Sequence, residues 1–191
     1  AIFWKNNYEK LNLFCVNINY DQLSSSGPQK NIEFLNSTST KLPFSDNSVD
    51  RVLALESSQH FKPLKDFISE SKRILKSDGI LTLALPVTLP SASFAKLGIL
   101  KFTWSSEHYS LEHVRELVVS GGFTINDEKL IGKNVYTPLA NYYIKNRVKL
   151  KKSILEKYPK YVEKILCRSI LKMKKASEQK IIDYVILKCR I

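Results

Sequence analysis

The chain of 191 residues is 43% apolar and 10% aromatic, which excludes a disordered protein, and its length suffices for one buried core with an appendage. No apolar run approaches the ~20 residues needed to span a bilayer. Three cysteines, far apart and without metal-ligand spacing, favour buried thiols in a reducing cytoplasm. The net charge is +12, yet residues 145–175 hold twelve Lys and Arg against two Glu, so the basicity belongs to one segment.

The periodicity of apolar residues predicts strands that alternate with helices along most of the chain. In chain order we expect the tail of a helix at 1–11, a strand at 11–19, a short helix at 20–26 ended by Gly27-Pro28, strands at 31–36 and 49–56, a helix at 63–76, a strand at 80–87, a loop or short helix at 90–105, a helix at 110–119, and strands at 123–131 and 181–191. The strand at 80–87 is wholly apolar, which is typical of a strand buried on both faces of a parallel sheet. The alternation therefore predicts a doubly wound, Rossmann-like α/β sheet, which binds ligands at the carboxyl ends of its strands.

A basic segment at 135–179 interrupts the last two expected strands. Pro159 divides it, and apolar residues recur at helical spacing on both sides of this proline. We therefore expect two amphipathic helices, at about 138–157 and 160–176.

This interruption predicts an α/β core at 1–134 and 180–191 with a basic helical insertion at 135–179. The favoured interpretation of the insertion is a lid whose apolar stripe covers an acceptor pocket. The second is peripheral contact of 145–175 with an anionic membrane. A contact to nucleic acid is disfavoured, and a plain solvated charged surface is the remaining alternative.

Two motifs flank the strand expected at 49–56. Leu-Pro-Phe-Ser-Asp-Asn-Ser-Val-Asp at 42–50 precedes it, and Glu-x-x-Arg-x-Leu-Lys-x-x-Gly at 70–79 follows it. In these motifs the chain resembles the class I S-adenosylmethionine-dependent methyltransferases, in the small-molecule and lipid branch that is called methyltransferase type 11-like. The resemblance implies S-adenosylmethionine as methyl donor and a small-molecule or lipid-like acceptor of apolar or amphiphilic character.

The resemblance also implies a Gly-x-Gly-x-Gly loop after a first strand, where the family holds the methionine end of the cofactor. Glycine stands only at positions 27, 79, 98, 121, 122 and 132, so the sequence has no such loop. The similarity starts one strand late, and we expect a chain truncated at its amino end. The missing strand would lie between the strands at 11–19 and 49–56, so we expect two half-sheets with unpaired edges, or a partner chain that supplies the strand.

The resemblance places cofactor-binding side chains after the first two strands. Asn17 corresponds to an acidic residue that accepts from the ribose hydroxyls, and Ile18 would lie next to the adenine. Ser37, Thr38 and Ser39 correspond to a Gly-Asp-Ala sequence whose Asp accepts from the adenine amino group. Asn17 and Thr38 depart from the family's acids, although both can still accept a hydrogen bond. A polar strand end and a plain Ser/Thr-rich loop are the competing interpretations.

Catalytic residues are expected directly after the strand at 49–56. Methyl transfer from a sulfonium needs alignment, exclusion of water and sometimes removal of a proton, so we expect binding side chains and one base. His60 matches a His that lies by the acceptor in related enzymes, and an imidazole can accept a hydroxyl proton at neutral pH. Glu56 could bind the cofactor, orient His60 or neutralise a cationic intermediate, and Gln59 would contact the substrate. The competing interpretation of His60 is a structural residue before Phe61.

Further candidates for substrate binding lie before the helix expected at 110–119. Trp104 and His108 belong to a loop that can close over a substrate, whereas His113 is expected as a solvated residue of the helix itself. No metal site is predicted, because no His, Cys or acidic cluster has ligand spacing.

The sequence therefore favours transfer of a methyl group from S-adenosylmethionine to a small apolar or amphiphilic acceptor, in the cytoplasm or at the periphery of a membrane. One alternative is a non-catalytic remnant or fragment that acts by binding, which the absent glycine loop, Asn17 and Thr38 support. Another is a basic membrane- or RNA-associated module.

Overall fold

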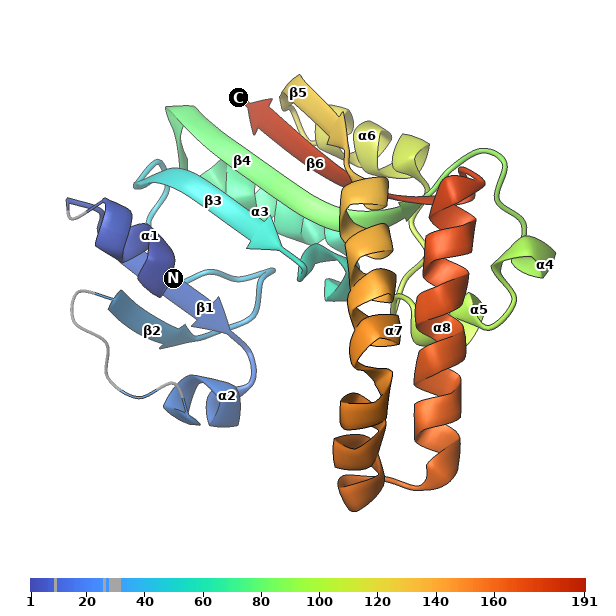
Figure 1. The fold of residues 1–191 in the computed structure, drawn as a ribbon. Coiled ribbons are helices and arrows are strands. Elements are labelled where there is room, and N and C mark those ends of the chain that lie inside the picture. The colour runs from blue at the N-terminus through green and yellow to red at the C-terminus, as the bar shows by residue number, and fades with distance from the viewer. Residues whose placement is uncertain (9, 26, 28–31) are drawn as a thin grey trace.

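The structure, a computed structural model, describes residues 1–8, 10–25, 27 and 32–191. The described residues form two sheets (Figure 1). One pairs β1 (Leu13–Asn17) with β2 (Ile32–Asn36) in parallel, and the other has the order β3-β4-β6-β5, with β3 (Val49–Leu55), β4 (Leu75–Thr88), β5 (Thr124–Leu130) and β6 (Ile182–Arg190). Two short helices, α1 (Ile2–Asn7) and α2 (Tyr20–Ser25), flank β1. The predicted Rossmann-like α/β fold is confirmed; the predicted boundaries at residues 26, 28 and 31 lie outside the described residues.

The crossover from β3 to β4 explains why the predicted strand at 80–87 is shorter than the observed one. Helix α3 (Leu64–Ile74) ends where β4 begins, at Leu75. The pairing of β3 with β4 then jumps from Val49↔Leu75 to Arg51↔Ile80, so residues 76–79 bulge out of register. A Cβ at Gly79 would lie 2.8 Å from the carbonyl oxygen of Lys76, which makes glycine the fitting residue for this bulge.

Helices cover both faces of the larger sheet. On one face α3 and α6 (Leu111–Ser120) pack on β4 and β6 through a core that includes Phe67, Ile68, Leu83, Leu85, Val114, Val118 and Val185. On the other face a second cluster joins β4 and β6 to α5 (Leu100–Thr103), the short helix α4 (Phe94–Leu97) and the insertion, through Leu97, Leu100, Tyr136, Ala176, Ile182 and Tyr184. Strand β4 is buried on both sides, as its apolar sequence predicts.

The insertion is a helical hairpin of α7 (Gly132–Lys157) and α8 (Lys160–Glu178), and its turn contains Pro159 (Figure 1). It connects β5 to β6, which pair antiparallel. The predicted helix at 138–157 begins six residues earlier, at Gly132, whose amide donates to Oδ1 of Asp183 at 2.7 Å. Ala140, Tyr143, Cys167 and Ile170 are buried in the seam between the two helices. Much of the predicted apolar stripe lies outside this seam, since Leu155, Ile165 and Leu171 are exposed.

Strands β1 and β3 each keep one edge without a strand partner among the described residues. Within the described residues β1 pairs only with β2, and β3 pairs only with β4. The strand that the resemblance places between β1 and β3 stays a prediction. Leu53 and Leu55 on β3 are exposed on one face of that strand.

Candidate functional site

The candidate site lies at the carboxyl ends of the parallel strands. Figure 1 shows the arrowheads of β1, β2 and β3 directed toward the side of the molecule that carries α7 and α8. Directly after β3 the chain turns at Glu56, a non-glycine residue with a φ of +53°, and then forms the 3-10 helix η1 (Ser58–His60). Such a left-handed residue at the end of a strand costs free energy, which is typical of functional sites.

His60 is bonded to a serine from a distant loop. Its Nδ1 lies 2.7 Å from Oγ of Ser106, and the Ser106 hydroxyl donates to the carbonyl oxygen of Gln59 at 2.6 Å. A hydroxyl has a single hydrogen, and that of Ser106 is donated to the Gln59 carbonyl oxygen. Toward His60 the serine oxygen can therefore only accept a hydrogen bond. We therefore assign the tautomer with hydrogen on Nδ1, which leaves the Nε2 lone pair as the free base.

Glu56 lies in a cluster with two buried tyrosines. Its backbone N–H and the hydroxyl of Tyr184 both donate to the carbonyl oxygen of Ala84, each at 3.0 Å. Burial raises the pKa of Tyr184, and the Glu56 carboxylate raises it further. Burial likewise raises the pKa of Tyr136, again with a smaller contribution from Glu56. Both phenols therefore stay neutral near this carboxylate at physiological pH, and the Tyr136 hydroxyl donates to the carbonyl oxygen of Asp183.

Trp104 joins this cluster from the loop after β4. Its indole N–H donates to the Tyr136 hydroxyl at 3.1 Å, and its ring lies 5.8 Å from that of His108, centroid to centroid. Nε2 of His108 is 3.2 Å from the carbonyl oxygen of Leu100, which accepts from it. His113 stacks on Tyr109.

Gln59 contributes buried polar atoms. Its side-chain N–H donates to Oε2 of Glu56 at 3.4 Å, while its Oε1 is buried with no partner in the described part of the chain. The hydroxyl of Ser58 is also buried and unpaired there. An unpaired buried acceptor is costly, so Gln59 could receive a donor group of a ligand.

The predicted cofactor residues form a separate group at the ends of β1 and β2. Oδ1 of Asn17 accepts from the backbone N–H of Asn19 at 2.9 Å, and Asn36 Nδ2 donates to the carbonyl oxygens of Asn17 and Ile18 at 3.0 Å. The side-chain oxygen Oδ1 of Asn17 keeps a second lone pair, and Ile18 is 71% exposed at the strand end.

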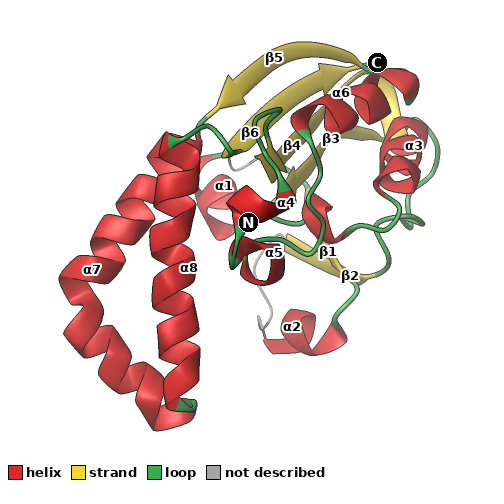
Figure 2. Cartoon of the chain, turned by 90° about the vertical axis from the view of Figure 1, so that its right-hand side faces the viewer, coloured by secondary structure: helices red, strands yellow, loops and turns green. Residues whose placement is uncertain are grey.

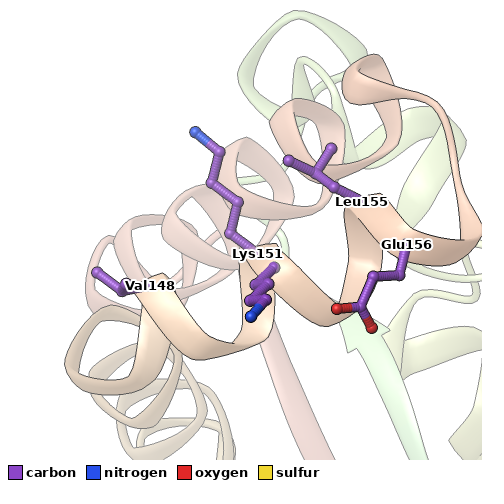
Figure 3. A pocket seen from close by; sticks show the side chains of 5 residues that line it. Val148, Lys151, Leu155 and Glu156 are labelled. Carbon is purple, nitrogen blue, oxygen red and sulfur yellow. The ribbon is translucent and has the colours of Figure 1, made fainter.

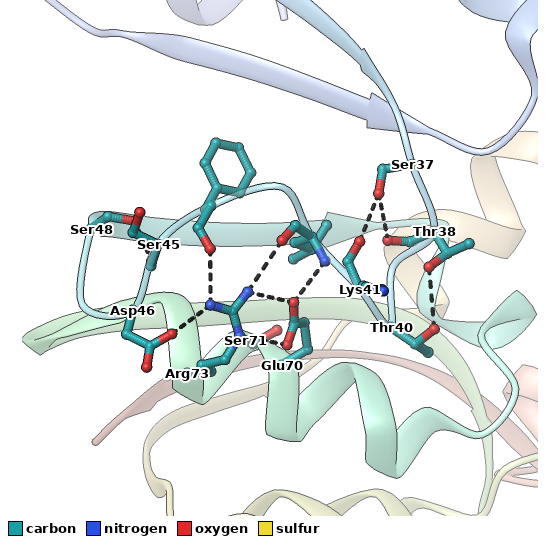
Figure 4. A network of polar contacts seen from close by, with 12 residues as sticks. Ser37, Thr38, Thr40, Lys41, Ser45, Asp46, Ser48, Glu70, Ser71 and Arg73 are labelled. Atoms are coloured by element: carbon teal, nitrogen blue, oxygen red, sulfur yellow. Dashed lines mark hydrogen bonds and ion pairs between the residues drawn. The ribbon is translucent and has the colours of Figure 1, made fainter.

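The loop after β2 is held by local contacts. Oγ of Ser37 donates to the carbonyl oxygen of Lys41 at 2.7 Å, and Oγ1 of Thr38 lies 3.3 Å from Oγ1 of Thr40 (Figure 4). Ser39 is half-buried between them. These residues thus fit the adenosine half of S-adenosylmethionine. Asn17 offers a hydrogen-bond acceptor, Ile18 an apolar side chain, and the loop after β2 hydroxyl groups. The sequence supplies no glycine loop for the methionine half.

Sequence reasoning missed three members of the site. Tyr136 was assigned to the insertion, Tyr184 to a plain strand, and Ser106 to a loop. The structure brings these residues to Glu56, Trp104 and His60. A tyrosine among apolar neighbours needs a buried partner for its hydroxyl, and this is the only signal that could have pointed to Tyr184.

No group of His, Cys, Asp and Glu in the described ranges could hold a metal ion. Nor does any helix among them have the length and apolar character to cross a membrane.

The fold is similar to that of the class I methyltransferases. The family described as methyltransferase domain matches residues 3–83 of this chain. The chain is 26% identical over 145 residues to erythromycin 3''-O-methyltransferase of Saccharopolyspora erythraea. The aligned region covers 68% of this chain and 46% of that relative. It therefore spans about half the length of that relative.

Two solved structures show the same fold. The cyclopropane synthase MmaA2 of Mycobacterium tuberculosis has a TM-score of 0.81 and 16% identity, over 98% of this chain and 72% of that one. The mycolic acid cyclopropane synthase CmaA1, in complex with SAH and CTAB, has a TM-score of 0.81 and 17% identity, over 100% of this chain and 73% of that one. The predicted class I methyltransferase fold is thereby confirmed.

Proposed function

We propose that this protein transfers a methyl group from S-adenosylmethionine to a small apolar or amphiphilic acceptor. The observation that carries the proposal is the His60–Ser106–Gln59 arrangement, which leaves a free imidazole nitrogen beside the end of β3. The matched domain family and the SAH-bound relative support the donor. The amphiphile CTAB in the same relative supports the acceptor class.

In this proposal the chain's residues position the acceptor and take its proton. When bound, the cofactor supplies an electrophilic methyl group. Nε2 of His60 accepts a hydroxyl proton from the acceptor, and Gln59 Oε1 accepts a hydrogen bond from a donor group of the acceptor. The Glu56 carboxylate, held among neutral phenols, favours a positive charge that develops nearby. Trp104 and His108 flank the acceptor and exclude water.

Cofactor binding is expected to be weak because only the adenosine half has matching side chains. Isothermal titration with S-adenosylhomocysteine tests this directly. Asn17→Ala should weaken binding by about fivefold, the value of one hydrogen bond. Asn134→Ala, on an exposed position of α7, is the matched control and should change nothing.

A labelled methyl donor with a panel of hydroxyl-bearing amphiphiles tests the transfer. If S-adenosylhomocysteine does not bind, the proposal is contradicted. Binding without transfer to any acceptor would favour the alternative, a binding module. That alternative is supported by the local partners of Asn17 and Thr38.

The three cysteines are free within the described residues, which supports our placement of the protein in the reducing cytoplasm.

A further inference from the structure

The outer half of the α7–α8 hairpin stands away from the sheets. Figures 1 and 2 both show its turn, near Pro159, far from every strand. The contacts to the core come from the base of the hairpin, through Val135, Tyr136, Met173 and Ala176. Beyond the base, α7 and α8 pack on each other.

The outer half of α7 has two apolar faces. Tyr143 and Leu150 belong to the seam with α8. Ile144, Val148 and Leu155 recur at helical spacing on a different face, which we call the outer stripe. Val148 is 89% exposed, Ile144 52% and Leu155 36%, so the described chain covers this stripe only in part and leaves Val148 almost bare.

Lysines border the outer stripe. Figure 3 shows a shallow hollow on α7 with Val148, Lys151, Leu155 and Glu156 around it, and Lys152 also lines it. The aliphatic stems of such lysines can lie along apolar surface while the ammonium groups reach outward. Exposed Tyr158 and Tyr161 at the turn add amphipathic rings.

We propose that the outer half of the hairpin docks on an anionic lipid interface, with the outer stripe among the headgroups and the lysines on lipid phosphates. The charge argues for this partner, because residues 145–175 carry twelve Lys and Arg against two Glu. The same charge repels a second copy of this chain. An RNA backbone would satisfy the lysines but would leave Val148 and Leu155 exposed. A helix with one apolar and one basic face lies in a bilayer interface, so both halves of the pattern are satisfied at once.

Docking in this way would tether the candidate site to the membrane through the base of α7. Tyr136 at the base of α7 contacts Trp104, so the hairpin connects the site to the lipid surface. The inference does not depend on methyl transfer, because the surface is defined by the hairpin alone.

Co-sedimentation of the intact protein with vesicles tests the inference. Phosphatidylcholine vesicles should bind more protein as their phosphatidylserine content is raised from 0 to about 40%. Added salt should reduce binding, because it shortens the distance over which the lysines attract the lipid phosphates, about 8 Å at physiological ionic strength. Val148→Ser with Leu155→Ser should lower the partition coefficient by about tenfold, from loss of buried apolar area. Lys151→Glu with Lys152→Glu should lower it by tenfold or more.

Matched controls separate the patch from overall charge and overall hydropathy. Lys65→Glu with Lys133→Glu removes the same charge from exposed positions outside the patch, and Val119→Ser removes an exposed apolar side chain from α6. Both should bind like the unchanged protein. Circular dichroism must show unchanged helix content in every variant.

Three results would overturn the inference. The first is binding that ignores phosphatidylserine content. The second is an equal loss in the Lys65/Lys133 variant, which would assign binding to net charge alone. The third is a dimer, detected by sedimentation velocity, that the Val148/Leu155 variant abolishes, because the stripe would then be an interface between two copies.

Discussion

Arg73 binds both carboxylate oxygens of Glu70, with Nε 2.8 Å from Oε2 and Nη2 2.7 Å from Oε1. The same guanidinium reaches Oδ1 of Asp46 at 2.6 Å and the carbonyl oxygen of Phe44 at 2.9 Å, and Glu70 accepts from the backbone N–H of Leu42 at 2.7 Å (Figure 4). The motif at 42–50 and the motif at 70–79 therefore meet in one network. These residues carry the resemblance to the methyltransferases, yet they fix the loop before β3 on α3.

Arg73→Met should destabilise the fold by about 1–2 kcal/mol. Hydrogen bonds to charged groups contribute about 1.5–3 kcal/mol when buried, and the value is reduced here because the Arg73 side chain is 35% exposed. Urea unfolding would measure the change. Arg51→Met is the matched control. Arg51 is exposed, and among the described residues its only hydrogen bond is to the carbonyl oxygen of its neighbour Asp50. Equal losses of stability in both variants would contradict the prediction.

The same network predicts a dependence of stability on pH. The hydrogen bond from Arg73, followed by the amide of Leu42 and nearby positive charge, lowers the pKa of Glu70 below its ordinary value of 4.5. A carboxylate whose pKa is lowered in the folded state stabilises the fold fully at pH values above its ordinary pKa of 4.5. This stabilisation is lost as the pH falls through the folded-state pKa. The difference in unfolding free energy between the unchanged protein and Glu70→Gln should therefore shrink below about pH 4.5. A difference that stays constant down to pH 3 would exclude this assignment.

The seam of the hairpin holds a buried acid. Oε1 of Glu163 accepts from Nε of Arg147 at 2.9 Å and from the Tyr143 hydroxyl at 3.1 Å, and its side chain is 2% exposed. Glu163→Ala would leave the Tyr143 hydroxyl without its acceptor, while the Arg147 side chain, which is 46% exposed, would be hydrated, and the change should cost about 1–3 kcal/mol. Amide hydrogen exchange should accelerate in the outer half of α7 and α8. Glu156→Ala, an exposed acid of the same hairpin, should leave exchange unchanged.

His60→Ala should reduce turnover by about 10²–10⁴-fold if Nε2 takes the acceptor's proton. Affinity for S-adenosylhomocysteine should stay within twofold, because the cofactor residues form a separate group. Unchanged turnover with a confirmed acceptor would return His60 to a structural role.

Ser106 is the positioning residue for His60. In long-range proton–nitrogen spectra of the unchanged protein, Nδ1 should carry the hydrogen, and Ser106→Ala should shift the imidazole toward the other tautomer. Turnover should fall by about three- to tenfold, and Ser106→Thr, which keeps the hydroxyl, should restore it. Spectra in which Nε2 carries the hydrogen in the unchanged protein would contradict the assigned tautomer.

The fold was largely predictable because its elements are marked by strong local patterns. The apolar run at 80–87 and the helical spacing in α3 identified the central β3–α3–β4 unit, and Pro159 located the turn of the hairpin. The bulge at 76–79 was missed because its residues are polar and interrupt the apolar run. The seam of the hairpin was missed because a sequence shows which residues share a helix face but not what covers that face.

The candidate site was predictable in part. Glu56, Gln59 and His60 follow one strand, so their proximity is a local property, and the structure places them together. Ser106 is 46 positions from His60, and Tyr136 is 32 from Trp104, so chain topology alone brings them together. The roles of all these residues remain predictions for the experiments above.

The position of β6 has a consequence for how the sheet assembles. In the described part of the chain β5 reaches β4 only through β6, yet the whole hairpin separates β5 from β6 along the chain. Closing so long a loop as random coil would carry a large entropy cost, and such non-local pairing slows folding. A hairpin that forms first brings its two ends together, and its base is anchored where Gly132 meets Asp183. The helices then act as a rigid spacer, and we expect the stability of their seam to govern how quickly β5 finds β6.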